Sequence, residues 1–167
     1  MPPAEIVVPG EPCLVLRAIT EHDGEIEQAL SRVEDVPRWT FYPADLGDDD
    51  ARRRAARAVE RSHAGLAQRY VISRQDEAVG TAGLTALDGD TPAVFYALLP
   101  SARGAGVATR VVLALVEHAL ASGARGVRLF ALAGNAASEG VARRAGFTFV
   151  EERPDEIDGA PMRLWVR

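Results

Sequence analysis

Two short apolar segments in the second half of the chain flank a longer segment with helical periodicity. Residues 93–99 and 127–132 are mostly apolar and of strand length, and residues 108–121 carry apolar side chains three and four positions apart. A strand, a helix and a second strand in this order require a right-handed crossover. The pattern therefore predicts that the two strands run parallel.

The rest of the chain is typical of an antiparallel sheet with helices packed on it. Further strands are predicted at 13–17, 70–74, 78–87, 147–151 and 162–166. Helices are predicted after Thr20, after Asp48 and between Asn135 and Gly146. The segment 35–46, which contains two prolines and three aromatic residues, is expected to be an irregular loop. The fold class that follows is α+β, with a mixed, mostly antiparallel sheet, one parallel strand pair and helices on both faces.

The length and the N-terminal residues predict a single domain. The 167 residues are enough to form one hydrophobic core. Four prolines within residues 1–12 predict an extended N-terminal arm, which leaves 13–167 as the folded domain. No apolar run reaches the roughly 20 residues that a membrane-spanning helix needs, and the N-terminal residues lack the pattern of a secretory signal. We therefore expect a soluble, cytoplasmic protein that does not bind membranes.

Charge and composition exclude several classes of protein. The formal net charge is −5, which argues against nucleic-acid binding, because that binding depends on a surplus of basic residues. All 19 basic residues are arginine, which excludes a lysine-containing phosphate loop and Schiff-base chemistry. The single cysteine, Cys13, excludes an internal disulfide, and the three histidines lie far apart in the sequence. We therefore expect no metal site.

Arginines are concentrated in the helix predicted after Asp48. Three aspartates at 48–50 precede five arginines, at Arg52, Arg53, Arg54, Arg57 and Arg61. Such a run is compatible with an anionic partner. However, acids in the first turn and bases toward the end of a helix also complement its dipole, while the alanines between them supply an apolar inner face. We favour this second, structural interpretation.

The segment that follows the first parallel strand has the features of an anion site. In an open sheet, ligands bind beyond the carboxyl ends of parallel strands, where residues 99–108 and 134–138 both arrive. Gly104 and Gly106 allow several backbone N–H groups to converge on one anion at a helix N-terminus, and Arg103 adds a positive charge. A dinucleotide site is not favoured, because its third glycine and the acidic residue after the next strand are missing.

The string from Tyr96 to Phe147 resembles the GNAT superfamily of acyl-CoA-dependent N-acetyltransferases. The family's Arg/Gln-x-x-Gly-x-Gly/Ala signature is matched by Arg103, Gly106 and Ala108. The resemblance extends over roughly residues 14–166. The Gly-Asn-x-x-Ser and Arg-Ala-Gly-Phe pieces near Ser138 and Phe147 look most like the branch that acetylates the N-termini of ribosomal proteins.

This resemblance implies an acetyltransferase that moves an acetyl group from acetyl-CoA to a primary amine by direct attack in a ternary complex. The acceptor is a small-molecule amine or a protein N-terminus, and no metal takes part. Because dimers are common among relatives, a homodimer is one state to expect. The residues expected to bind acetyl-CoA are Leu98, Leu99, Arg103, Gly104, Ala105, Gly106, Val107, Ala108 and Asn135.

The catalytic groups are less well defined than the cofactor site. Many relatives carry a tyrosine at the position of Ala142, so we expect Ser138 to act as the proton donor to the leaving thiol. The first parallel strand lacks the glutamate that serves many relatives as general base. The general base is then either a chain of water molecules or one of three acids in or next to the aromatic loop, namely Glu34, Asp35 and Asp45. These gaps also leave open a non-catalytic acyl-CoA-binding module of the same fold.

Overall fold

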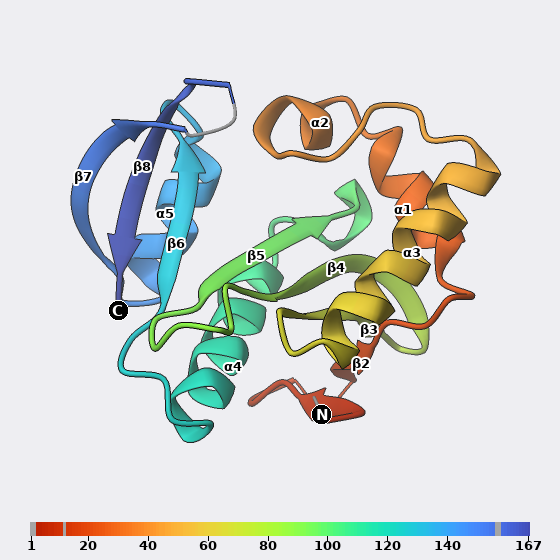
Figure 1. Ribbon diagram of the computed structural model, residues 1–167, viewed down its shortest axis with the longest axis horizontal. Coiled ribbons are helices and arrows are strands. Elements are labelled where there is room, and N and C mark those ends of the chain that lie inside the picture. The colour runs from red at the N-terminus through yellow and green to blue at the C-terminus, as the bar shows by residue number, and fades with distance from the viewer. Residues whose placement is uncertain (1–2, 12, 156–157) are drawn as a thin grey trace.

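One eight-stranded sheet forms the centre of the molecule (Figure 1). The computed structural model describes residues 3–11, 13–155 and 158–167. The strands are β1 (Glu5–Val7), β2 (Leu14–Ala18), β3 (Ala67–Arg74), β4 (Glu77–Thr85), β5 (Ala93–Leu98), β6 (Arg128–Leu132), β7 (Thr148–Pro154) and β8 (Pro161–Val166). The order across the sheet is β1-β2-β3-β4-β5-β6-β8-β7. Among the described strands, β5 and β6 form the one parallel pair, which confirms the predicted α+β class.

Helices cover both faces of this sheet, as predicted. They are α1 (Gly24–Ser31), α2 (Asp35–Trp39), α3 (Asp48–His63), α4 (Val107–Ala121) and α5 (Ala136–Arg144), together with the short 3₁₀ helix η1 (Pro100–Ala102). On one face, apolar residues of α4 and α5 such as Leu115 and Val141 pack against the strands. On the other, Leu30 of α1 and Ala55 of α3 pack against Val71 and Ala97. Within the described residues, no helix is long and apolar enough to cross a membrane.

The parallel pair is joined along only a small part of its length. Residues are paired at Ala93↔Arg128 and Val94↔Leu129, and the described register ends there. Figure 1 shows β5 and β6 diverging from this common point toward their carboxyl ends. Because the backbone groups beyond Val94 that face β6 are not paired with it, the gap is open to a ligand.

The helix α3 has the dipole-matched charge pattern that its sequence predicted. Its inner face consists of the buried alanines Ala51, Ala55 and Ala58, and three aspartates occupy its first turn. Arg61 and His63 lie in its last turn, where positive charge is favourable.

Two segments differ from the sequence-based expectations. Within the N-terminal arm, Glu5–Val7 forms strand β1 and pairs antiparallel with β2 at the edge of the sheet. The prolines that predicted an extended arm flank this strand, so they do not remove its hydrogen bonds. Within the expected loop 35–46, Asp35–Trp39 forms the helix α2. Pro37 lies in its first turn, where an N–H group has no partner within the helix, so the proline is tolerated.

Candidate functional site

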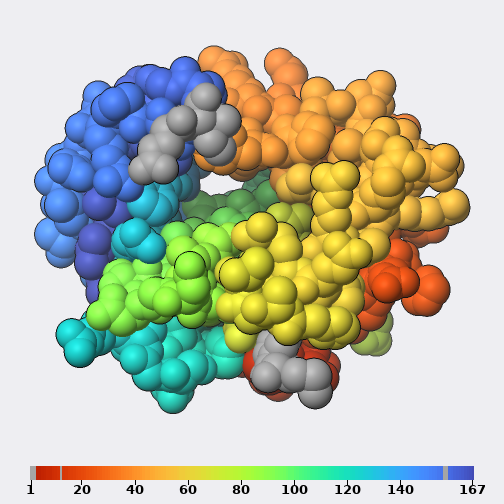
Figure 2. All heavy atoms as spheres, viewed as in Figure 1, coloured from red at the N-terminus to blue at the C-terminus, as the bar shows by residue number. Residues whose placement is uncertain are grey.

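A large cleft opens where β5 and β6 diverge. Its volume is about 1180 Å³, which exceeds the ~300–1,000 Å³ of typical small-molecule sites and leaves room for two reactants. Figure 2 shows the hollow between the orange segment that carries α2 and the blue C-terminal strands. The predicted site residues that line it are Leu98, Arg103, Gly104, Gly106, Val107, Ala108, Asn135 and Ser138. The other two predicted site residues, Leu99 and Ala105, are described in the structure but do not line the cleft.

The alternation of hydrogen bonds along β5 decides which backbone groups face the cleft. The N–H of Leu99 donates to the carbonyl of Val79 on β4 at 2.9 Å. Residues two apart on a strand face the same neighbour, so Ala97 and Phe95 also turn toward β4, and Tyr96 and Leu98 turn toward the gap. The expectation that Leu99 pairs with a ligand is therefore corrected. Leu98 keeps that role, since its N–H faces the cleft.

The loop before α4 presents backbone groups in a geometry that is suited to an anion. Gly104 and Gly106 have φ angles of +84° and +76°, a region that favours glycine. A side chain at Gly104 would meet nothing within 4 Å, so packing inside the chain does not explain this glycine. The helix begins at Val107, and the first N–H groups of a helix have no partner within it. They point outward at the positive end of the helix dipole, which favours a phosphate.

Arg103 has a different role from the one expected. Its guanidinium donates to both carboxylate oxygens of Asp35, at 2.6 and 3.0 Å, and to the carbonyl of Leu98, at 2.8 and 3.1 Å. The arginine thus joins α2 to the end of β5, and its charge is shared with a carboxylate. The same hydrogen bonds hold the pKa of the Asp35 carboxyl below its usual value.

Two other arginines lie beside the loop before α4. Arg110 donates to the carbonyl of Ala105 at 3.0 Å and pairs with Glu11, and Arg144 lies at the end of α5. Its Nε lies 3.3 Å from the hydroxyl oxygen of Thr109, in the first turn of α4. In the described part of the chain, Arg144 has no carboxylate within ion-pair distance, and it lines the cleft. Sequence analysis missed this residue, because only the folded chain brings the end of α5 to the start of α4. Its place in the Arg-Ala-Gly-Phe piece was the available signal.

Two hydroxyl groups meet inside the cleft. The side chain of Asn135 accepts a hydrogen bond from the N–H of Ser138 at 3.1 Å, which confirms the predicted N-cap of α5. The Ser138 hydroxyl lies 3.0 Å from the phenol oxygen of Tyr96 on β5. Burial raises the pKa of Tyr96, although the hydrogen bond with Ser138 and the charge of Arg144 oppose this. The phenol therefore stays protonated at neutral pH and is able to donate a proton.

Tyr96 is a site residue that sequence analysis did not select. It stands in the strand that lacks the glutamate of many relatives, and a sequence does not show contacts between residues 42 positions apart, such as Tyr96 and Ser138. Its side chain shares a face of the sheet with those of Val94 and Leu98, and this alternation along β5 was the signal that could have found it.

None of the three proposed carboxylates has the setting of a free general base. Asp35 lines the cleft but is held by Arg103. Asp45 is exposed and lies 3.1 Å from Arg32, and neither it nor Glu34 is among the described residues that line the cleft.

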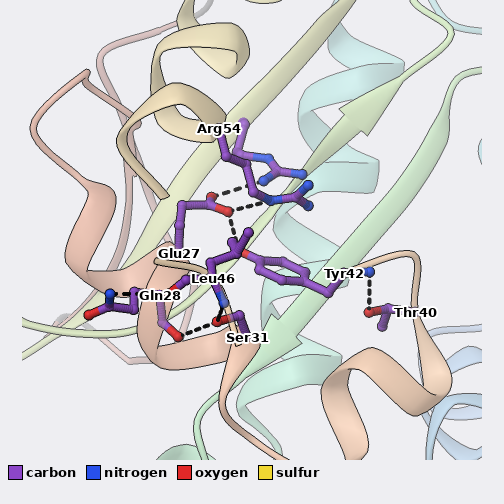
Figure 3. Close-up of polar contacts among 8 residues, drawn as sticks. Glu27, Gln28, Ser31, Thr40, Tyr42, Leu46 and Arg54 are labelled. Carbon is purple, nitrogen blue, oxygen red and sulfur yellow. Dashed lines mark hydrogen bonds and ion pairs between the residues drawn. The ribbon is translucent and has the colours of Figure 1, made fainter. Parts of the chain in front are cut away.

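A buried carboxylate organises the wall of the cleft opposite the anion loop (Figure 3). Glu27 of α1 is fully buried and accepts hydrogen bonds from Arg54 at 2.7 Å, from Arg69 at 2.9 Å and from the hydroxyl of Tyr42. Arg54 also lies over the Tyr42 ring, 4.1 Å from its centre. Burial and the nearby carboxylate of Glu27 raise the pKa of Tyr42. This cluster fixes the aromatic segment after α2 to α1 and α3.

The described residues offer no cluster of metal ligands. Within 3–11, 13–155 and 158–167, no three His, Cys, Asp or Glu residues are close enough together to hold a metal ion.

Comparisons with known proteins agree with this geometry. Residues 14–148 match the family model described as the acetyltransferase (GNAT) domain. None of the curated proteins matches the sequence significantly. Among solved structures, the acetyl transferase of Salmonella typhimurium that modifies the N-terminal serine of the 50S ribosomal protein L7/L12 is similar, with 22% identity and a TM-score of 0.82. The similarity covers 96% of this chain and 97% of that one.

Two similar structures contain ligands. The ribosomal L7/L12 alpha-N-protein acetyltransferase RimL, solved with coenzyme A, is 21% identical over 96% of both chains, with a TM-score of 0.79. The microcin C7 self-immunity acetyltransferase MccE, solved with acetyl-CoA and AMP, is 18% identical, with a TM-score of 0.87. That similarity covers 99% of this chain and 97% of the other. At these identities the likeness establishes the shared fold.

Proposed function

Because the chain belongs to the GNAT acetyltransferase domain family, we propose that it transfers an acetyl group from acetyl-CoA to a primary amine in a ternary complex. The observation that carries the proposal is the cleft itself. It runs without interruption from the glycine loop at the start of α4, along the unpaired edge of β5, to the wall formed by α2 and α3. Such a cleft suits a long thioester that ends in a pyrophosphate and leaves space for an acceptor beyond its acyl end.

The residues of this chain supply three kinds of contact for acetyl-CoA. The N–H groups of Gly104 to Thr109 and the Arg144 guanidinium suit the pyrophosphate. The backbone of Tyr96 suits the amides of the pantetheine arm, which would lie along β5 as an added strand. The carbonyl of Leu98 is held by Arg103, so its N–H remains for the acyl end. Asn135 faces the same space from the end of β6.

The reaction needs positioning, a donor for the carbonyl oxygen and a proton for the leaving thiol. The neutral amine attacks the thioester carbon and loses a proton to water, and the thiolate departs and gains one. The N–H of Leu98 is suited to stabilise the oxyanion. Tyr96 and Ser138 share a hydrogen bond in the cleft and can pass a proton to the thiolate, whose free pKa is about 8.5. Positioning of both reactants supplies roughly 7–11 kcal/mol of the barrier reduction.

The acceptor class follows from the relatives and from the shape of the wall. Two of the similar proteins act on the N-terminus of a ribosomal protein, so a protein N-terminus or a small amine is the proposed acceptor here. The walls beyond the acyl end contain Trp39, Phe41 and Tyr42, which suits a partly apolar acceptor.

Release of free thiol from acetyl-CoA tests the activity directly. The purified protein is incubated with acetyl-CoA and a panel of amines that includes peptides with free N-termini, aminoglycosides and polyamines. We expect thiol release that depends on one class of amine and yields an equal amount of acetylated product by mass spectrometry. Binding of acetyl-CoA without turnover on every amine would favour the non-catalytic acyl-CoA-binding module instead.

A further inference from the structure

A second cavity, lined by arginines, adjoins the acceptor end of the cleft. Its volume is about 430 Å³. We call it the arginine cavity, after its five arginines Arg53, Arg54, Arg57, Arg61 and Arg69. The cleft and the arginine cavity share four lining residues, namely Arg54, Arg69, Thr85 and Phe95. The two cavities are therefore neighbours, with these four side chains at their common boundary.

The local charge of the arginine cavity is opposite to that of the whole chain. Its five arginines face one lining carboxylate, Asp50, and the buried Glu27 behind two of them. A surplus of three positive charges results, in a protein whose net charge is −5. Such a local field attracts anions even where the overall charge repels them.

The fold accounts for some of these arginines and not for others. Arg53 pairs with Asp50, and Arg54 and Arg69 pair with Glu27. Arg61 lies in the last turn of α3, where the helix dipole favours it. Arg57 lies in the middle of the helix, and in the described part of the chain it has no carboxylate within ion-pair distance.

The spacing on α3 adds an electrostatic cost that Asp50 offsets at Arg53 and the helix dipole offsets at Arg61, but that no described ion pair offsets at Arg57. Arg53, Arg57 and Arg61 follow one another at four-residue intervals, so their side chains are neighbours along one stripe. Like charges at this spacing destabilise a helix. The dipole interpretation of this helix is confirmed for its ends, but it does not explain the stripe, which an anion in the arginine cavity would stabilise.

The floor of the arginine cavity is built to hold its arginines in place. Gly83 on β4 lies between Arg69 on β3 and Phe95 on β5. A Cβ at Gly83 would overlap the backbone carbonyl oxygen of Gln68 and lie 2.8 Å from the Phe95 ring, so only glycine fits between the backbone of β3 and this ring. Arg69 then lies over that ring, 4.9 Å from its centre, while its other contact is Glu27. These contacts position the guanidinium before any ligand arrives.

A buried hydroxyl that lines the cleft, outside the arginine cavity, lacks a partner. Thr81 of β4 is fully buried and lines the cleft, and within the described residues its hydroxyl makes no hydrogen bond. An unpaired buried polar group is costly, and a polar ligand atom would satisfy it.

From these observations we propose that the acetyl acceptor carries an anionic group, a carboxylate or a phosphate, which binds in the arginine cavity while the amine lies in the cleft. This inference rests on the proposed acetyltransferase function. Arg57 and Arg61 supply the charge that is free to pair, and Arg54 and Arg69 form the boundary that the acceptor crosses.

Matched acceptors test the proposal and distinguish the two sources of negative charge. One series contains ω-amino acids of increasing length with their carboxamides, and the other contains ω-aminoalkyl phosphates with the corresponding amino alcohols. We expect the best anionic member to exceed its neutral partner in kcat/KM by at least about tenfold, through KM, with a preference that decreases as salt is added. Equal kcat/KM for anionic and neutral partners throughout both series would overturn the proposal.

Two arginine variants of the same helix provide the matched control. Arg57→Gln removes a charge from the arginine cavity, whereas Arg52→Gln removes one from a described residue that lines neither cavity. We expect Arg57→Gln to lower kcat/KM for the anionic acceptor about three- to tenfold and to leave the neutral acceptor unchanged. Arg52→Gln should change neither, and equal effects of the two variants would contradict the proposal.

A binding measurement separates this proposal from the acetyltransferase function. Inorganic phosphate is titrated into protein saturated with coenzyme A, so that the glycine loop is already occupied. Weaker phosphate binding in Arg57→Gln than in Arg52→Gln supports the anion site even if no amine is acetylated. Phosphate affinity that is the same in both variants and in the unmodified protein would overturn it.

Discussion

At the residue scale, the contact between Tyr96 and Ser138 replaces a tyrosine that this chain lacks. Ala142, at the position where many relatives carry that tyrosine, is fully buried on α5. Tyr96 reaches the same cleft from β5, and its phenol oxygen lies 3.0 Å from the Ser138 hydroxyl. In the proposed reaction the proton donor is supplied by these two hydroxyls together, one from β5 and one from α5.

Removing either hydroxyl should affect turnover more than binding. For Ser138→Ala and for Tyr96→Phe we expect kcat to fall about 10- to 100-fold, while the affinity for acetyl-CoA changes less than threefold. Because the two hydroxyls act as one unit, the double variant should be little worse than the single ones. Steady-state kinetics and calorimetry measure the two effects. Equal losses of turnover and affinity would rule out the proton-donor role.

A second prediction at this scale concerns His118 on α4. Its Nε2 lies 3.0 Å from the Gln68 side-chain oxygen, and burial lowers its pKa from the ordinary value of 6.5. The folded state thus favours the neutral ring, and the unfolded chain binds the proton more readily. The stability that follows is present above pH 6.5 and is lost as the pH falls toward the lowered pKa.

We therefore expect the melting temperature to decrease between about pH 7 and pH 5, and to decrease less in His118→Gln. His22→Gln is the matched control, because His22 is exposed. Thermal unfolding at a series of pH values measures the difference. A pH dependence that is the same in His118→Gln as in the unmodified protein would contradict the prediction.

At the scale of elements, the anion site that we propose at the start of α4 combines a backbone conformation with the positive charge of an arginine. The loop turns on two glycines with positive φ, and Arg144 from the end of α5 lies beside the first turn of the helix. Arg103, by contrast, ties α2 to the end of β5. Arg103 and Arg144 thus make different contacts near one loop, and variants can separate the roles proposed for them.

Loss of Arg144 should weaken binding only through the pyrophosphate. For Arg144→Gln we expect about a tenfold loss of affinity for acetyl-CoA and none for S-acetylpantetheine, which lacks the pyrophosphate. Arg103→Gln should weaken both ligands to a similar extent, because Arg103 positions the β5 edge that both share. Calorimetric titration of each variant gives these values. If Arg103→Gln weakened the binding of acetyl-CoA alone, the pyrophosphate contact would belong to Arg103, and the prediction would be wrong.

The glycine loop allows a further test with a matched control. Gly104→Ala and Gly123→Ala both place a side chain at positive φ with no neighbour within 4 Å, but Gly123 follows the other end of α4. Each should lower the free energy of unfolding by about 1 kcal/mol. Only Gly104→Ala should also reduce acetyl-CoA affinity. Denaturant unfolding and calorimetry measure the two quantities, and similar affinity losses in both variants would be inconsistent with an anion site at this loop.

At the scale of the whole molecule, local sequence patterns predicted most helices and strands. Contacts between distant residues determine which side chains meet in the cleft. The strand–helix–strand order from 93 to 132 predicted the parallel pair, because the crossover rule leaves one arrangement. The glycine loop and the Asn135 cap were also predictable, since each depends on a few neighbouring residues. The strand β1 and the helix α2 were missed, because both are very short and contain or adjoin prolines.

The remaining features depend on contacts between distant residues, for which one sequence gives no signal. Glu27 has the pattern of an ordinary helix-surface acid, yet it is fully buried between Arg54 and Arg69. Arg103 meets Asp35 across 68 positions, which removed a charge from the predicted phosphate site. Each such pairing is set by the packing of helices on the sheet rather than by local periodicity.

The binding of acetyl-CoA to the gap between β5 and β6 is the central claim, and calorimetric titration tests it most directly. We predict saturable binding of one acetyl-CoA per chain, with S-acetylpantetheine at least about tenfold weaker because it cannot reach the glycine loop. The claim would be contradicted if acetyl-CoA produced no heat of binding and no thermal shift. Equal affinities for the two thioesters would contradict it as well.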